Sequence, residues 1–109
     1  MDQFQAQPFS IRVLTMQAQA VRVRVSGEVD LSTAPELERA LVQEICAARE
    51  VLLDLSGVSF IDSSGLHAIV TAARAAQSNG GALSLDSRLP DQARRVLEIT
   101  GLQSLVEVG

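Results

Sequence analysis

The sequence predicts a single α/β domain with a mixed β-sheet, in which an N-terminal β-hairpin is followed by βα units whose helices pack on the sheet. Alternating or short apolar runs are typical of strands, and segments with an apolar residue every three or four positions are typical of helices. The two kinds of segment follow one another along most of the chain. The 109 residues suit one domain, and 47% hydrophobic residues provide enough apolar surface for a core.

The charge and composition exclude several classes of partner. Nine arginines face thirteen acidic residues, for a formal net charge of −4, whereas a nucleic acid or an anionic membrane requires a basic surface. The N-terminus lacks a basic and apolar leader, and no apolar segment approaches the roughly 20 residues of a membrane span. We therefore expect a cytoplasmic protein that binds neither nucleic acid nor membrane.

The N-terminal part predicts a flexible start and then the hairpin. Residues 1–8 are polar and end in a proline, so we expect a flexible N-terminus over residues 1–8 and one domain over residues 9–109. Alternation begins after the proline and is clearest in the VRVRV run at residues 21–25. The two alternating runs lie close enough in sequence to pair with each other.

The same alternation predicts which side chains face the core. In the first run, Phe9, Ile11 and Val13 share one face, opposite Ser10 and Arg12, and in the second run we expect Val21, Val23 and Val25 to point into the core. Arg22 and Arg24 should then point into water, with a docking role for a partner as the alternative.

A first helix is predicted over residues 33–48. Thr33 and Glu36 have the spacing of a capping box, and Pro35 is tolerated in a first helical turn. An apolar stripe follows at Leu37, Leu41, Ile45 and Ala48. Cys46 is the only cysteine, so we expect a small core residue without a disulfide.

The remaining elements alternate between strands and helices. The VLLDL run at residues 51–55 is typical of a strand covered on both faces. A second helix, with a stripe of Leu66, Ile69, Val70 and Ala73, should end before the Asn79-Gly80-Gly81 turn. Later segments predict a strand at residues 82–85, a helix from Pro90 to Thr100 ended by Gly101, and a short final strand within residues 102–108.

The FIDSSGL segment at residues 60–66 is the principal candidate for a functional site. Asp62, Ser63 and Ser64 lie where a buried strand leads into a helix, and all three are favourable N-cap residues. One cap is sufficient, so the segment has two interpretations. It either caps the helix and nothing more, or it also presents a serine as a phosphoacceptor, with Gly65 allowing close approach of the backbone.

Other chemistries lack their motifs. Neither G-x-x-x-x-G-K-S/T nor G-x-G-x-x-G occurs, and a single His with a single Cys cannot form a typical zinc site. Ser63 and His67 are four residues apart, but no G-x-S-x-G elbow surrounds them. We therefore expect no cofactor, no metal and no enzymatic activity, and His67 should be exposed or face an interface.

Several segments in this order resemble one known family. They are SGEVDLSTAPEL, LLDLSGVSFIDSSGL, the NGG turn and ARRVLEITGL, and together the likeness extends over residues 9–106. This pattern is similar to the anti-sigma factor antagonists of the STAS family, and the D-S-S-G-L motif placed downstream of G-E-V-D is its most specific part. The resemblance implies a single STAS-type domain.

The resemblance also implies a mechanism of partner switching. A family member binds an anti-sigma factor, typically a GHKL-type serine kinase, and so frees a sigma factor for transcription. The kinase phosphorylates the serine that matches Ser63, which ends binding, and a phosphoserine phosphatase restores it. Free family members are commonly monomeric. The alternative is a STAS module that serves as a scaffold or subunit of a stressosome-like or lipid-transport complex without a phospho-switch.

Individual residues acquire roles by the same resemblance. Asp30, in the G-E-V-D segment, matches an aspartate that lies near the phosphorylated serine. Asp62, Ser64 and Gly65 would shape the loop. Leu66, with the helix that follows, would contribute to the partner surface, and His67 stands where the family often has a small residue.

Overall fold

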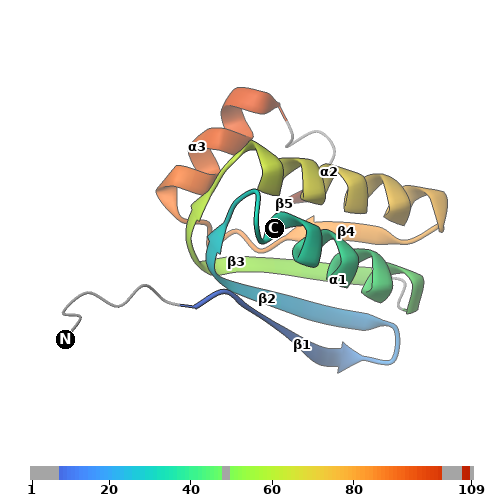
Figure 1. Ribbon diagram of the computed structural model, residues 1–109. Coiled ribbons are helices and arrows are strands. Elements are labelled where there is room, and N and C mark those ends of the chain that lie inside the picture. The colour runs from blue at the N-terminus through green and yellow to red at the C-terminus, as the bar shows by residue number, and fades with distance from the viewer. Residues whose placement is uncertain (1–7, 48–49, 102–106, 109) are drawn as a thin grey trace.

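The computed structural model describes residues 8–47, 50–101 and 107–108, and within them it confirms the predicted α/β fold (Figure 1). The elements are β1 (Ser10–Gln17), β2 (Ala20–Val29), α1 (Ala34–Ala47), β3 (Glu50–Ile61), α2 (Ser63–Ser78), β4 (Ala82–Leu85), α3 (Asp91–Thr100) and β5 (Glu107–Val108). Residues 102–106 of the predicted final strand, Ala48 and residues 1–7 of the predicted flexible start lie outside the described residues. Among the described residues, no helix is long and apolar enough to cross a membrane.

The sheet has five strands in the order β1-β2-β3-β4-β5. β1 and β2 form the predicted antiparallel hairpin, and β2, β3, β4 and β5 run parallel to one another. Val29, the last residue of β2, is paired with Ile61, the last residue of β3. The segments that leave these two strands therefore start side by side at one edge of the sheet.

The core lies between one face of the sheet and the helices α1 and α2, which pack against each other (Figure 1). The sheet contributes alternate residues of β2 and β3, among them Val23 and Leu53, both without exposed surface. The helix α1 contributes the predicted stripe of Leu37, Leu41 and Ile45. This arrangement buries apolar surface on one side of the sheet, and such burial stabilises a fold by roughly 25 cal/mol for each Å² removed from water.

The short helix α3 packs at the end of β3. The side-chain amide of Gln92 accepts a hydrogen bond from the N–H of Ile61 at 3.0 Å and donates one to the carbonyl of Ile61 at 2.8 Å. Gln92 thus satisfies the backbone of Ile61 on both its donor and its acceptor. This pairing fixes the last residue of β3 immediately before the FIDSSGL segment enters α2.

The structure corrects one apolar prediction and limits another. Val13, on the same predicted apolar face as Phe9 and Ile11, is 44% exposed, because β1 is an edge strand that α1 does not cover (Figure 1). Phe9 and Ile11 are partly buried against the core. Cys46 is exposed rather than buried, because it follows Ile45 and one step along a helix turns the side chain about 100° away from the core.

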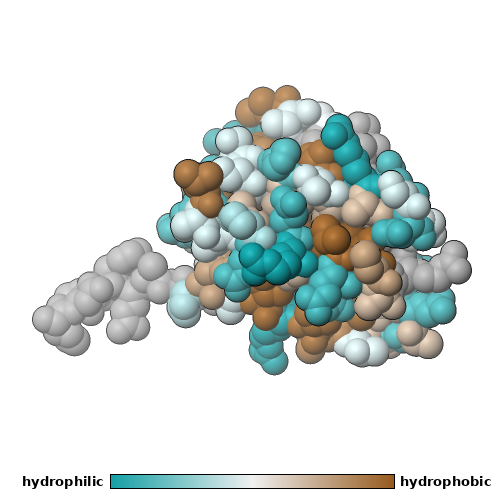
Figure 2. All heavy atoms as spheres, turned by 45° about the vertical axis from the view of Figure 1, so that its right-hand side comes forward, coloured by the Kyte–Doolittle hydropathy of each residue, from teal (hydrophilic) through white to brown (hydrophobic). Residues whose placement is uncertain are grey.

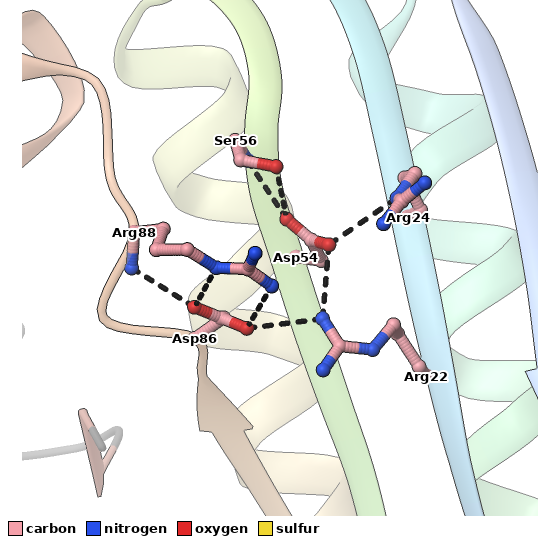
Figure 3. Close-up of polar contacts among 6 residues, drawn as sticks. All are labelled: Arg22, Arg24, Asp54, Ser56, Asp86 and Arg88. Atoms are coloured by element: carbon pink, nitrogen blue, oxygen red, sulfur yellow. Dashed lines mark hydrogen bonds and ion pairs between the residues drawn. The ribbon is translucent and has the colours of Figure 1, made fainter. Parts of the chain in front are cut away.

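Arg22 and Arg24 point away from the core as predicted, but their side chains are only 21% and 43% exposed and are bonded to carboxylates rather than simply solvated. Both lie on the sheet face opposite α1 and α2, where they bond to the buried carboxylate of Asp54 (Figure 3). Arg22 also bonds to Asp86, which Arg88 holds from its other side. Strand alternation correctly placed the arginines outside the apolar core, but it could not show that they bind the buried Asp54 on the neighbouring strand.

Candidate functional site

Asp62 caps α2 and thereby decides what remains for the two serines. Its carboxylate accepts the backbone N–H groups of Ser64 at 2.9 Å and Gly65 at 3.2 Å. Its own N–H donates to the carbonyl of Val29 at 3.1 Å, which ties the start of α2 to the end of β2. Ser63 is exposed, and its hydroxyl has no hydrogen-bond partner among the described residues. The cap is therefore complete without Ser63.

Gly65 and Leu66 support this turn from beneath. A Cβ on Gly65 would lie 2.6 Å from Cγ1 of Ile61 and 2.7 Å from Cγ1 of Val29, so only glycine fits between the helix and the two strand ends. Leu66 is 5% exposed and packs in the core. Its side chain is therefore not part of the exposed surface, which corrects the expectation that Leu66 contributes to a partner surface.

Asp30 lies at the same edge of the sheet as Asp62. Each follows one of the paired residues Val29 and Ile61, so the structure brings the two acids of the separate motifs to neighbouring strand ends. The Asp30 carboxylate accepts the hydroxyl of Ser32 at 2.7 Å. This bond, with backbone N–H donors of the same turn, lowers the pKa of Asp30. Asp30 is thus a fixed negative charge at neutral pH.

The turn that follows Asp30 departs from the predicted capping box. The hydroxyl of Thr33 accepts the N–H of Asp30 and donates to the carbonyl of Glu28, both at 2.9 Å, and makes no bond to Glu36. The hydroxyl is used to close the turn between β2 and α1 instead of the first turn of the helix. Leu31, within this turn, is 77% exposed.

A groove of about 820 Å³ lies between the N-terminal parts of α1 and α2. Its lining residues are Leu31, Ala34, Pro35, Glu38, Arg39, Val42, Gln43, Ser63, Ser64 and His67. On the turned view in Figure 2, exposed apolar side chains (brown) are interspersed among polar ones (teal). Four lining residues, Leu31, Ala34, Pro35 and Val42, form the apolar floor of the groove, so the candidate serine lies beside an apolar surface that a partner could cover.

The groove also includes residues that the sequence analysis did not select. His67 is exposed, as predicted, and shares the groove with Ser63. Leu31, in the turn before α1, and Arg39, in α1, were not selected from the sequence. The leucine directly after the G-E-V-D motif was the one signal that could have pointed to this region. No group of three or more His, Cys, Asp and Glu side chains that could hold a metal ion occurs in the described ranges.

Comparison with known proteins identifies the family. The model described as "Mlab, STAS domain" matches residues 13–107. An anti-sigma-B factor antagonist of Staphylococcus aureus is 36% identical over 95 residues, which are 86% of this chain and 87% of the relative. An anti-sigma factor antagonist from Mycobacterium paratuberculosis has a similar structure, with a TM-score of 0.80 and 27% identity over 93% of this chain and 85% of its own.

The same fold occurs in the Bacillus anti-sigma factor antagonist SpoIIAA, which is 20% identical. Its unphosphorylated form has a TM-score of 0.77 over 92% of this chain and 88% of its own. Its phosphorylated form has a TM-score of 0.72 over 92% of this chain and 91% of its own. Sequence and fold therefore agree with the motifs at Asp30 and Asp62–Leu66. The chain belongs to the STAS-domain family, among the anti-sigma factor antagonists.

Proposed function

We propose that this protein binds an anti-sigma factor that is a GHKL-type serine kinase, and so frees a sigma factor, as long as Ser63 is unphosphorylated. Phosphorylation of Ser63 by that kinase ends the complex, and a phosphoserine phosphatase restores it. The protein acts in the cytoplasm as a monomer, and it binds its partner rather than catalysing a reaction.

The observation that carries this proposal is the state of the Ser63 hydroxyl. It is exposed at the first residue of α2 and unbonded within the described residues, while Asp62 alone caps the helix. A kinase can therefore reach this hydroxyl without opening the helix. The names of the relatives support the same class of partner, and SpoIIAA is a relative in fold that exists in a phosphorylated form.

Electrostatics explains how one phosphate could switch the complex. A phosphoserine adds about −1.5 to −2 charges at neutral pH. At Ser63 that charge would join the carboxylates of Asp62 and Asp30 at one edge of the sheet and would have to be desolvated in any interface covering the groove. A loss of about 3 kcal/mol in binding free energy weakens a complex more than a hundredfold. No change of fold is required.

Mass spectrometry of the intact protein tests the proposal. The protein is incubated with ATP and, in turn, with each GHKL kinase encoded in the same genome, as wild type, Ser63→Ala and Ser64→Ala. We expect one phosphate on wild type and on the matched control Ser64→Ala, and none on Ser63→Ala. The phosphorylated protein should then bind its kinase at least a hundredfold more weakly in calorimetry.

The opposite result would favour a different role. If none of the kinases phosphorylates the wild type, the phospho-switch is wrong, and the protein is a STAS scaffold or a subunit of a stressosome-like or lipid-transport complex. The match to a family model described by the name Mlab makes this alternative the one to examine next. Affinity purification from the native cell would then recover a standing assembly that Ser63→Ala leaves intact.

A further inference from the structure

We propose that the phosphate on Ser63 is held in the α1–α2 groove by Arg39 and His67, so that it covers part of the groove besides adding charge. This inference rests on the proposed function, because it concerns the phosphorylated form of the same serine. It assigns to two side chains outside the D-S-S-G motif the task of binding the modification. The consequence is an off state in which the partner surface is physically occupied.

The fold places both side chains beside the serine. Ser63 and His67 are four residues apart on α2, the spacing at which side chains on a helix are neighbours. Arg39 comes from the facing helix α1 and lines the same groove. The groove that Ser63 lines is therefore also lined by an imidazole from α2 and a guanidinium from α1. Gln43, one turn beyond Arg39, offers an amide donor on the same wall.

Neither side chain is already engaged. The side chains of Arg39 and His67 are exposed and have no hydrogen bond or ion pair within the part of the chain that the structure describes. The arginines of the opposite sheet face differ, since Arg22 and Arg88 are bonded to carboxylates there. Arginine forms paired, charge-assisted hydrogen bonds with phosphate, which makes Arg39 the stronger of the two candidate partners.

The acids around the groove determine where the phosphate goes. Glu38 lines the groove, and Asp30 and Asp62 lie at the adjacent strand ends. All three repel a phosphate, and Glu38 makes no ion pair with Arg39 among the described residues. A phosphate on Ser63 therefore lowers its energy by turning away from the acids, toward Arg39 and His67. In that position it lies over the apolar floor of the groove.

A titration of the phosphate tests this arrangement without any kinase. Phosphoserine is introduced at position 63 during translation, by an engineered suppressor tRNA, and its second pKa, ordinarily about 6, is measured by ³¹P NMR. The variants Arg39→Gln and His67→Gln are compared with wild type, and Arg74→Gln serves as the matched control. Arg74 is an exposed arginine of α2 that does not line the groove.

We expect the phosphate pKa to be lower in the folded wild type than in a phosphopeptide of residues 60–66. Arg39→Gln and His67→Gln should each raise it, by about 0.5 for Arg39→Gln, as expected for one exposed ion pair, and Arg74→Gln should leave it unchanged. Equal values in wild type, both groove variants and the peptide would show a solvated phosphate and overturn the inference. A failure of every kinase to modify Ser63 would refute the proposed function without altering this result.

Discussion

One guanidinium nitrogen of Arg22 lies 2.9 Å from Oδ2 of Asp54 and 3.0 Å from Oδ2 of Asp86. It thereby connects β2, β3 and the residue that follows β4 across the sheet face that the helices leave uncovered (Figure 3). Asp54 has no exposed surface, so its charge depends on these partners. The cluster stabilises the strand order on the face opposite the candidate site, and it allows a test of the fold that is independent of Ser63.

Replacing Arg22 should destabilise the protein strongly. Arg22→Ala leaves the buried Asp54 with the hydrogen bonds from Ser56 and with Arg24 as its only ion-pair partner among the described residues, at 3.3 Å and half exposed. Removing one partner of a buried ion pair costs about 3–5 kcal/mol, and we expect the lower end here because Arg22 is partly exposed. Urea unfolding measures the loss. Arg12→Ala, an exposed residue of β1 opposite Arg24, is the control and should change stability by no more than about 0.5 kcal/mol. Equal effects of the two substitutions would contradict the assigned role.

Stability should fall on acidification. Burial alone would raise the pKa of Asp54, but hydrogen bonds from Ser56 and the two arginines outweigh burial and lower it. Hydrogen bonds from Arg88 and then Arg22 hold the pKa of Asp86 well below its usual range. Both folded pKa values lie below the unfolded value of about 3.9, so this stabilisation is complete above that pH and is lost as the pH falls through the folded values.

Urea unfolding between pH 7 and pH 2 should therefore give a plateau above about pH 5 and a decline below about pH 4. Asp86→Asn, which cannot titrate, should be less stable at pH 7 but show a shallower decline in acid. An acid limb identical to that of wild type would mean that Asp86 does not contribute to it.

Gly65→Ala should destabilise the protein although it places a better helix former within α2. The gain in helix propensity is about 1 kcal/mol. Against it, the new Cβ would meet Ile61 and Val29 at 2.6 and 2.7 Å, and both side chains are buried and cannot move away cheaply. Overpacking of this kind costs about 1–3 kcal/mol, so we expect a net loss of up to about 2 kcal/mol in thermal or urea unfolding.

Gly80→Asn is the matched control for that substitution. Gly80 has a φ of +71°, which asparagine tolerates, and a Cβ there meets nothing within 4 Å. The control should therefore lose only a few tenths of a kcal/mol. If Gly65→Ala proved as stable as wild type, the packing of Gly65 against the strand ends would not be tight.

Substitutions can show that Asp62, and not Ser63, provides the cap of α2. Asp62→Ala removes both cap bonds and should cost about 1 kcal/mol of stability, whereas Asp62→Asn keeps an acceptor and should cost little. Ser63→Ala should also leave stability within about 0.5 kcal/mol, because Asp62 provides the cap. Chemical denaturation checks all three. Destabilisation by Ser63→Ala equal to that of Asp62→Ala would mean that the serine is part of the cap after all.

Much of the fold could be predicted from the sequence, because its strands and helices follow local rules. The alternation of VRVRV predicted the strand β2, and Gly101, in a left-handed backbone conformation, ends α3 as its position in the sequence indicated. The least accurate predictions concerned side chains one step away from a clear stripe. Cys46 follows a buried residue and is exposed, and Val13 continues an apolar face that no helix covers.

The candidate site was partly predictable for the same reason. The caps and turns around Asp62 depend on residues within a few positions of one another, so the FIDSSGL segment could be placed at a strand–helix junction. The groove could not be predicted, because Arg39 and His67 belong to different helices. Their approach depends on how α1 and α2 pack.

The sequence by itself determined the order of the elements and placed Asp62, Ser63 and Ser64 as candidate caps at a strand–helix junction. Each of these depends on hydrogen bonds and side-chain spacing within one or two turns of chain. Only the tertiary structure decided that Arg22 meets Asp54 and Asp86, and that Asp30 and Asp62 share one edge. Those relationships require the register of parallel strands, and that register is set by the burial of the core between segments distant in sequence.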